Sequence, residues 1–521
     1  MKLCVTSKKM KEIEKNAIDI LKIPAIVLME RAAFEVARVI EENISDKEQS
    51  RVFIFVGSGN NGADGIATAR ILFLKNILVT IVKVGNNSST SEYDIQMEIA
   101  QKLKIEIVDF AISRENIVIK EKDIIIDGLF GIGLSRKVSG IYEEVVEYIN
   151  ESRAQKVIAI DIPSGLAATN GAVLGRAVRA SETVTFQFAK MGLYLNQGKK
   201  YSGKVLVADI GIPHILEEET LEYAYALKDK HNEETHILEE NSGCAYILEE
   251  KDMSNIPTRD VLANKGTYGK LLLIAGAEGM SGAAFLAAKA AYRVGAGLVK
   301  IFTVEANREV LQTQLPEAII TTYNKVDYLA KLEGEMKWAS HIVIGPGMGV
   351  DRISQEIVKR AMETKLPMVM DSDALNIIAS IENIKRLLGE HILITPHIKE
   401  MSRLTGMSVE EIKENIRECG QDFVNKYKVN LILKDATSVI VNAAGSTVLN
   451  INGTAALAKG GSGDVLAGIA GGLLCIGVKI EEVGEMASYI HARAGSEAGY
   501  KMGMHSVLAT DLIKEIKLES Y

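Results

Sequence analysis

Short apolar runs alternate with longer stretches of helical spacing along the N-terminal part of the chain. We expect helices over Ser7–Ile20, capped by Ser7, and over Val27–Glu42. Strands are expected at Val52–Val56, Leu78–Val84, Asp123–Asp127, Val157–Ile160, Thr183–Phe188 and Val205–Ile210. Because nearly continuous apolar strands separated by helices are typical of a parallel sheet covered on both faces, the pattern predicts an α/β domain with a Rossmann-like, doubly wound sheet.

A second alternation begins near residue 271 and predicts another α/β domain. Its strands are expected at Leu271–Gly276, Leu298–Val304, His341–Ile344, Met368–Met370, Ile392–Thr395, Leu431–Leu433, Ser438–Val441 and Thr447–Asn450. The last two flank the turn sequence at residues 442–445, which predicts a hairpin at one sheet edge. Residues 214–235 are polar, rich in glutamate and free of glycine, so we interpret them as a connecting helix and linker between domains 1–215 and 226–521.

Composition narrows the class of protein. The 521 residues are 47% hydrophobic and 25% charged, as in a globular protein of several domains. A net charge of −8 without a basic block argues against a nucleic-acid partner. The scattered cysteines have no metal-ligand spacing and fit a reducing cytoplasm. No secretion signal precedes residue 10, and the longest apolar run, 465–478, is too short to span a membrane, so we expect a cytoplasmic protein. A homo-oligomer is also expected.

The most informative stretch is the glycine-rich segment Gly460–Gly468, which opens an apolar helix. Glycines let the backbone approach an anion closely, and the free N–H groups of a helix N-terminus favour bound negative charge. Asp464 lies at the start of this helix, where a carboxylate can act as a base beside a bound phosphate. The segment therefore indicates phosphoryl transfer to a hydroxyl group, against the simpler interpretation of a glycine turn that enters a buried helix.

Polar and glycine clusters follow several strands of the second half, at the ends where open α/β sheets bind ligands. These clusters are the glycine loop 345–349, residues 371–376, 395–400 and 434–438. We expect them to meet at one sheet edge with the 460–464 loop. Asp371 and Asp373 are candidates for water-mediated magnesium binding or for helix capping, and capping is favoured for Asp373.

These motifs, together with Lys265–Lys270 and the turn 279–284, resemble those of the NAD(P)H-hydrate dehydratases, which have a ribokinase-like fold. The resemblance covers residues 240–518. It implies that a nucleotide with magnesium phosphorylates the hydroxyl of hydrated NADH or NADPH, after which phosphate leaves and the reduced nicotinamide is restored. ADP is favoured as the donor, with release of AMP and phosphate.

The resemblance also implies residue roles. Asp464 would be the catalytic base and would contact the hydrate, while Ala284, Gly349 and His397 would contact the hydrate as well. The nucleotide would be bound by Lys434, Asp435, Ala436, Thr437, Ser438 and Gly463. Two departures from the family pattern concern this nucleotide site: Asp435 replaces the usual glycine, and residues 453–459 lack the usual asparagine and proline. The plain alternative for His397 is a histidine fixed by the preceding proline turn.

In the first half, the loop Gly57–Gly65 follows a strand and opens a helix. Its glycines match a dinucleotide fingerprint, but no acid ends the next strand, so a permanently bound NAD is not implied. Asp127 and Asp161 end two further strands, where acids are candidate ligands or acid–base groups, or simple caps.

With residues 28–31 and 208–213, these motifs resemble the NAD(P)H-hydrate epimerases over residues 5–213. The resemblance implies that Asn61, Asp127 and Ser164 bind potassium, a hard cation that oxygen ligands suit. It implies that the hydrate is contacted by Asn60, Asn61, Gly62, Ala63, Asp64, Gly131, Ile132, Gly133, Leu134, Ser135, Arg136, Lys137 and Asp161. Asp161 is the expected proton-transferring group, with Lys190 as a possible second partner.

The interpretation that fits both halves is a bifunctional repair enzyme whose substrates are hydrated NADH, hydrated NADPH and ADP. One alternative is a ribokinase-like vitamin or sugar kinase whose N-terminal half is a regulatory ligand-binding module. Another is a nucleotide sensor or scaffold with degenerate sites, against which the intact asparagine pair and Asp464 argue.

Overall fold

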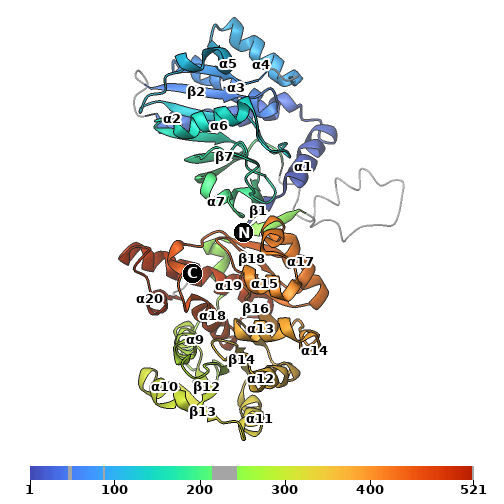
Figure 1. The fold of residues 1–521 in the computed structure, drawn as a ribbon. Helices are drawn as coiled ribbons and strands as arrows, with labels where there is room; N and C mark the ends of the chain where they lie inside the picture. The colour runs from blue at the N-terminus through green and yellow to red at the C-terminus, as the bar shows by residue number, and fades with distance from the viewer. Residues whose placement is uncertain (45–49, 86–88, 214–242, 519–521) are drawn as a thin grey trace, which may run out of the picture. The chain divides into compact units, whose positions relative to one another are not determined.

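The computed structural model describes residues 1–44, 50–85, 89–213 and 243–518. The chain divides into two compact units, one of residues 3–245 and one of residues 246–521 with Met1 and Lys2 (Figure 1). The domain boundary expected at residues 214–235 lies outside the described residues. It therefore stays a prediction.

The N-terminal unit is built on a wholly parallel sheet with the strand order β4-β3-β2-β5-β6-β7-β9. Its strands are β2 (Arg51–Val56), β3 (Leu78–Lys83), β4 (Glu106–Asp109), β5 (Ile124–Gly128), β6 (Lys156–Ile160), β7 (Glu182–Phe186) and β9 (Lys204–Ala208). The helices are α1 (Ser7–Asp19), α2 (Ala25–Asn43), α3 (Asn60–Leu74), α4 (Ser91–Lys102), α5 (Phe110–Ser113), α6 (Ile141–Glu151) and α7 (Gly198–Tyr201). A short pair of strands, β1 (Lys2–Val5) and β8 (Ala189–Lys190), lies beside them.

Alternate residues of β2 pack on opposite faces of this sheet, as the period of a strand requires. Val52, Ile54 and Val56 join a core with α2 and α3, whereas Phe53 and Phe55 join a second core with α6. Helices therefore cover both faces, which confirms the doubly wound sheet. The chain first builds β3 and β4 on one side of β2 and then crosses to β5 on the other, so the order of strands reverses between β2 and β5, the place where open α/β sheets bind ligands.

The C-terminal unit has the strand order β13-β12-β11-β14-β15-β16-β17-β18-β19-β10. Its strands are β10 (Cys244–Ile247), β11 (Lys270–Ile274), β12 (Leu298–Val304), β13 (Ile319–Tyr323), β14 (His341–Ile344), β15 (Met368–Met370), β16 (Ile392–Ile394), β17 (Asn430–Leu433), β18 (Ser438–Val441) and β19 (Thr447–Asn450). Pairing is parallel from β13 to β17 and antiparallel from β17 to β19, so the expected hairpin is confirmed.

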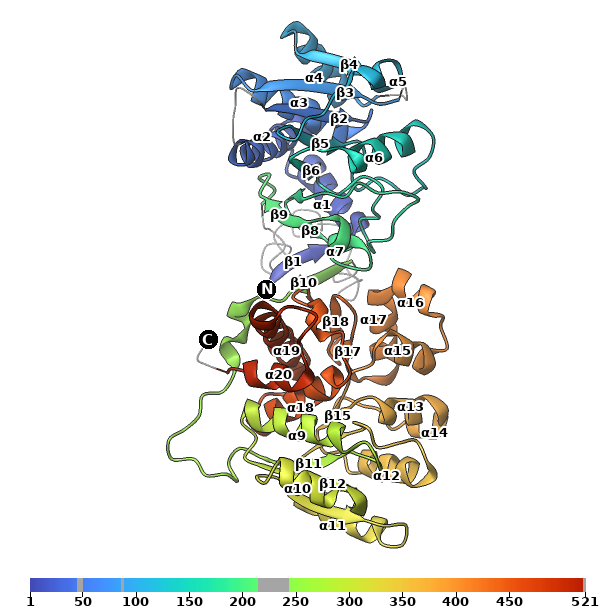
Figure 2. The ribbon, with the colours of Figure 1, turned by 60° about the vertical axis from the view of Figure 1, so that its left-hand side comes forward.

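Helices cover both faces of this second sheet, with α9, α18, α19 and α20 on one side and α12, α13, α15 and α17 on the other (Figure 2). The helices are α9 (Ser281–Val294), α10 (Arg308–Gln314), α11 (Tyr328–Trp338), α12 (Arg352–Glu363), α13 (Asp373–Ser380), α14 (Glu382–Lys385), α15 (Ile398–Thr405), α16 (Val409–Glu414), α17 (Ile416–Tyr427), α18 (Ser462–Cys475), α19 (Ile480–Met502) and α20 (Ala509–Glu515). A Cβ at Gly468 would lie 2.2 Å from the Ala287 carbonyl oxygen, so glycine lets α18 pack closely on α9.

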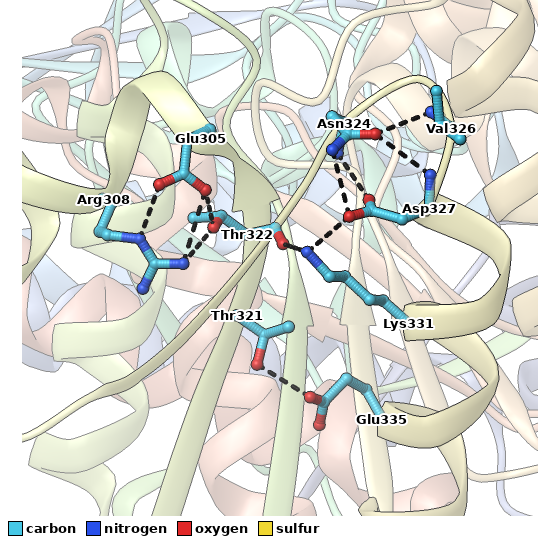
Figure 3. A network of polar contacts seen from close by, with 9 residues as sticks. All are labelled: Glu305, Arg308, Thr321, Thr322, Asn324, Val326, Asp327, Lys331 and Glu335. Carbon is cyan, nitrogen blue, oxygen red and sulfur yellow. Dashed lines mark hydrogen bonds and ion pairs between the residues drawn. The ribbon is translucent and has the colours of Figure 1, made fainter.

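The strand β13 forms the outer edge of this sheet and carries a network of polar side chains (Figure 3). Arg308 Nε donates to Glu305 Oε1 at 2.9 Å, and Lys331 Nζ lies 2.7 Å from Asp327 Oδ2 and donates to the Thr322 carbonyl at 2.8 Å. Charged groups along an edge strand discourage pairing with another chain, so we assign this network a structural role.

Several expectations about the elements need correction. The cap of α1 is Thr6 rather than Ser7, because the Thr6 hydroxyl accepts from the Lys9 N–H. The strands β1, β4, β8, β10 and β13 were not expected; β4 and β13 lie at sheet edges, where partly exposed strands carry polar residues among the apolar ones. In the described part of the chain, none of the four cysteines forms a disulfide. Among the described residues, no helix is long and apolar enough to cross a membrane.

Candidate active sites

The first turn of α18 forms the centre of the C-terminal site. Gly461 precedes the helix with φ of +85°, where a Cβ would lie 2.6 Å from Leu286 Cδ1, so only glycine fits without a shift. The N–H groups of the first turn have no partner within the helix and can bind an anion. Asp464 lies in this turn, partly buried and without an ion-pair partner among the described residues.

The ends of three neighbouring strands meet this turn. Asp371, after β15, is buried and accepts a hydrogen bond at 2.6 Å from Oγ1 of Thr395, which directly follows β16. Lys434, after β17, lies 2.8 Å from Asp371 Oδ1. A Cβ at Gly463 would lie 3.4 Å from both Asp371 Oδ2 and Lys434 Nζ. The convergence expected from the sequence is therefore confirmed for these clusters.

The electrostatics of the site favour a base that works near neutral pH. Burial raises the pKa of Asp464 to about 6, the charges of Asp371 and Asp373 raise it as well, and Lys434 lowers it. A carboxyl with a pKa near the working pH accepts a proton readily without being blocked by one. Asp464 therefore has the position and the proton affinity of a general base.

The loop after β14 approaches the same strand ends. The Gly349 N–H donates to Asp373 Oδ2 at 2.9 Å, and Gly349 has φ of +77°. The expectation that Asp373 caps α13 is wrong: Ser372 is the N-cap, and no side chain caps the helix. The carboxylate of Asp373 holds the glycine loop instead and still lies in the first turn, where the helix dipole favours it.

His397 is the N-cap of α15. Its Nδ1 accepts from the Glu400 N–H at 3.2 Å, its own N–H donates to Glu400 Oε2 at 2.9 Å, and its side chain is 49% exposed. Burial lowers the pKa of His397, and the charge of Lys434 lowers it further, so the ring is neutral near pH 7. One face of a capping histidine thus remains open to a ligand.

The other residues expected in this site differ in exposure. Ala284 is fully buried in the core, and the exposed residues of the turn 279–284 are Gly279, Met280 and Gly282. In the nucleotide loop Asp435 and Ala436 are exposed, whereas Thr437 is buried and Ser438 begins β18. Their contacts with substrate stay predictions.

In the N-terminal unit, the loop after β2 packs closely against the loop after β5. A Cβ at Gly57 would lie 2.2 Å from the Leu129 carbonyl oxygen, and one at Gly62 would lie 1.8 Å from the Gly57 carbonyl oxygen. Glycine at both positions lets α3 begin at Asn60, and Ala63 is buried behind it. Asn61 is buried, and its Nδ2 has no hydrogen-bond partner among the described residues.

Asp127 is completely buried at the end of β5. It accepts hydrogen bonds from Ser164 N at 2.7 Å and Ser164 Oγ at 2.6 Å, and from Leu129 N at 3.3 Å. Burial raises the pKa of Asp127 to about 6, although these hydrogen bonds lower it. A Cβ at Gly131 would lie 3.3 Å from Asn61 Oδ1, so the asparagine borders the same loop. Residues 133–137 of that loop are largely exposed.

Asp161 follows β6 with φ of +63°, an uncommon backbone conformation for this residue. Its Oδ1 accepts from Lys190 Nζ at 2.5 Å, Thr185 Oγ1 at 3.1 Å and Phe186 N at 3.3 Å. Lys190 is fully buried and also donates to the Phe186 carbonyl at 2.8 Å. The second oxygen, Oδ2, accepts no hydrogen bond from the residues that the structure describes, so one face of the carboxylate is available to a ligand.

The charge of Asp161 raises the pKa of two further carboxyls, Glu14 and Asp64. Burial and Asp161 raise the pKa of Glu14 to about 7, and burial, Asp161 and Glu14 raise the pKa of Asp64 well above its usual range. Glu14 was missed by the sequence reasoning. The available signal was its position in the apolar stripe of α1, one turn after the buried Met10.

Comparisons with known proteins cover both units. Residues 271–518 match a family model described as NAD(P)H-hydrate dehydratase, and residues 25–192 match one described as YjeF-related protein N-terminus. The chain is 32% identical to the bifunctional NAD(P)H-hydrate repair enzyme Nnr of Dictyoglomus turgidum, covering 99% of this chain and 98% of that protein. It is 41% identical to an NAD(P)H-hydrate epimerase of Limosilactobacillus reuteri, over 39% of this chain and 94% of that one.

Among solved structures, an ADP/ATP-dependent NAD(P)H-hydrate dehydratase from Bacillus subtilis, co-crystallised with ATP and Mg²⁺, is 28% identical, with a TM-score of 0.46. It covers 52% of this chain and 96% of that chain. Two α/β units, each with a carboxylate site at the carboxyl ends of a parallel sheet, define a two-site enzyme. The chain belongs to the family of bifunctional NAD(P)H-hydrate repair enzymes.

Proposed function

We propose that this protein repairs hydrated NADH and NADPH in two reactions. The N-terminal domain, residues 1–215, interconverts the R and S hydrates, and the C-terminal domain, residues 226–521, dehydrates the S hydrate at the expense of ADP. The observation that carries the proposal is the free carboxylate of Asp464, with a pKa of about 6, in the first turn of a helix beside the Asp371–Lys434 pair.

In the dehydration, Asp464 takes the proton of the hydrate hydroxyl while the oxygen of that hydroxyl forms a bond to the terminal phosphorus of ADP. The bond between that phosphorus and the bridging oxygen breaks, and AMP leaves. Phosphate then departs from the ring carbon, and loss of a neighbouring proton restores the double bond of the reduced nicotinamide. The N–H groups of residues 461–464 stabilise the charge on the transferring phosphoryl group.

Lys434 and Gly463 are proposed to bind the nucleotide, with residues 435–438 beside them. Lys434 contacts one carboxylate oxygen, and because its side chain is 22% exposed it retains surface for a phosphate oxygen. Magnesium bound with ADP would neutralise phosphate charge, and Asp371 and Asp373 are the carboxylates that lie nearest to the phosphoryl cradle. Ala284, Gly349 and His397 are proposed to contact the hydrate.

In the epimerase site, Asp161 is the proposed proton carrier, acting through its open Oδ2. Potassium would be held by Asn61, Asp127 and Ser164. The donors fit such an ion, because they are oxygens and the Asp127 carboxylate is buried with no cationic side chain against it among the described residues. The ion would neutralise Asp127 and leave Asp161 as the group able to exchange protons.

The test supplies purified R hydrate, S hydrate or their mixture with ADP or ATP at equal concentration, and follows the absorbance of the reduced nicotinamide. We expect the S hydrate to be repaired directly, the R hydrate after a lag, and ADP to support the faster rate. Faster restoration with ATP would contradict the donor assignment. Nucleotide consumption without restored absorbance would indicate a ribokinase-like kinase instead.

A further inference from the structure

A buried hydrogen bond connects helix α19 to the first turn of α18. His491 is 8% exposed, and its Nε2 lies 3.0 Å from Ser462 Oγ, which is itself buried. Ser462 is the first residue of α18, directly before Gly463 and Asp464. The imidazole thus holds the segment that carries both the anion-binding N–H groups and the proposed base.

Ser462 is the one residue with a side chain in the segment 460–463, because glycines occupy the other three positions. Glycine has a wide choice of backbone conformations and no side chain by which the fold can hold it. The Ser462 hydroxyl is therefore the anchor by which packed structure can fix this turn, and His491 supplies the contact.

The surroundings keep the His491 ring neutral. Burial lowers its pKa to about 4, and the charge of Lys434 lowers it further, although hydrogen bonding to Ser462 and the charge of Asp371 act in the opposite direction. At neutral pH the ring therefore anchors Ser462 without adding a charge beneath the Asp371–Lys434 pair.

We propose that His491 is a positioning residue of the dehydratase site, which fixes the glycine-rich turn through Ser462 and so sets the place of Asp464 and of the phosphoryl-binding N–H groups. This inference rests on the proposed function of Asp464 as the base. Since a displacement of about 1 Å at a reacting group can cost about 100-fold in rate, loss of the anchor should act on turnover rather than on nucleotide affinity.

The test compares His491→Leu, which removes the hydrogen bond, with His491→Gln, whose Nε2 can reach the same place. For His491→Leu we expect kcat of dehydration to fall about 10- to 100-fold, while KM for ADP changes less than about threefold. His491→Gln should recover most of the loss. Epimerase activity, which is proposed to reside in the other unit, should be unchanged in both variants and serves as a control for the amount of protein in each sample.

A matched control lies one turn earlier on the same helix. Ser488 Oγ accepts from Asn450 Nδ2 at 2.9 Å, and both residues are buried. Ser488→Ala therefore removes a buried hydrogen bond of α19 that does not reach the glycine-rich turn. It should lower the melting temperature of the C-terminal unit as His491→Leu does, yet leave kcat unchanged.

Ser462→Ala completes the experiment. If His491 acts through Ser462, the double variant Ser462→Ala/His491→Leu should be no slower than the slower single variant, because both changes remove one interaction. Additive losses, an equal loss in Ser488→Ala, or a His491→Leu kcat within about twofold of the unchanged protein would overturn the inference. If the unchanged protein restored no reduced nicotinamide, the proposed function would fail, and this inference with it.

Discussion

Each unit places a lysine beside an aspartate that follows a strand. In one unit this aspartate is the proposed catalytic carboxyl, and in the other it is a neighbour of the proposed catalytic carboxyl. In the N-terminal unit the fully buried Lys190 pairs with Asp161, the proposed proton carrier itself. In the C-terminal unit the partly exposed Lys434 pairs with Asp371, and the proposed base Asp464 is left without an ion-pair partner among the described residues. The two units therefore differ in whether the lysine contacts the proposed catalytic carboxyl itself or a neighbouring aspartate.

This difference follows from the demands of the two proposed reactions. A base that must take a proton near neutral pH benefits from burial and from neighbouring negative charge, which raise its pKa. A carboxylate that exchanges protons reversibly in a buried site needs a nearby positive charge, because that charge offsets the free energy lost when the ionised group is removed from water. Lys190 contacts the proposed catalytic carboxylate directly, whereas Lys434 contacts Asp371 and is proposed to bind the nucleotide.

The sharpest way to break this comparison is Asp464→Asn. The amide keeps the shape of the side chain but cannot accept the hydroxyl proton, so dehydration should fall by about two to four powers of ten. The measurement is restoration of absorbance from the S hydrate with ADP, with nucleotide binding followed in parallel. Exchange between the R and S hydrates in the same sample serves as the control. Turnover close to that of the unchanged protein would remove Asp464 from the mechanism.

The equivalent change in the N-terminal unit, Asp161→Asn, should stop the R-to-S exchange and leave dehydration of the S hydrate intact. The amide at this position can still accept from Lys190 but cannot shuttle a proton. The exchange is measured by separating the two hydrates after a timed incubation. If exchange persisted, Glu14 or Asp64, whose pKa values are raised by burial and by the charge of Asp161, would become the candidate proton carriers.

Replacing Lys190 should lower the free energy of unfolding more than replacing Lys434 does. Lys190→Met leaves Asp161 buried and unpaired, which typically costs about 3–5 kcal/mol. Lys434→Met breaks a pair that is partly open to water and should cost less. The two shifts are compared by calorimetry, with the double variant Asp161→Asn/Lys190→Met expected to regain most of the loss. Equal shifts for the two lysine variants would show that burial does not distinguish the pairs.

A smaller effect is expected for Asp127→Asn. If this residue holds potassium, replacement of the carboxylate by an amide should raise the potassium concentration needed for half-maximal exchange by about tenfold, or ~1.4 kcal/mol. Excess potassium should then restore much of the rate, whereas Asp161→Asn should not respond to the salt. Sodium at the same ionic strength is the control. A potassium response unchanged from that of the unaltered protein would exclude Asp127 as a ligand.

The smallest predicted effect concerns pH. Because Asp464 must be ionised to act as a base and its pKa is about 6, the rate of dehydration should rise with pH through that value. Asp371 raises this pKa, so Asp371→Asn should move the rising limb to lower pH, and the released Lys434 acts in the same direction. The pH profile of kcat measures the shift. A limb displaced upward would mean that Asp371 does not act on Asp464 by its charge.

The sequence determined most of the elements, apart from β1, β4, β8, β10 and β13, and the ends of the strands at which polar residues gather. Apolar runs such as residues 52–56 and 341–344 are long enough to be recognised as strands from the sequence. The glycine-rich turn before Asp464 is recognisable as well, because glycine is the residue that a turn opening a helix requires. The sequence also assigned the family, since ordered motifs in both halves matched known patterns.

Only the tertiary structure decided which side chains pair. Glu14, in a helix far away in the chain, interacts electrostatically with Asp161. Lys190 pairs with Asp161, and Lys434 pairs with Asp371 rather than with Asp464. Asp373 holds Gly349 instead of capping its own helix, and His491 holds Ser462 across two helices. Local spacing determines backbone conformation, but partner choice depends on distances between segments that the sequence order does not contain, and on how completely each group is removed from water.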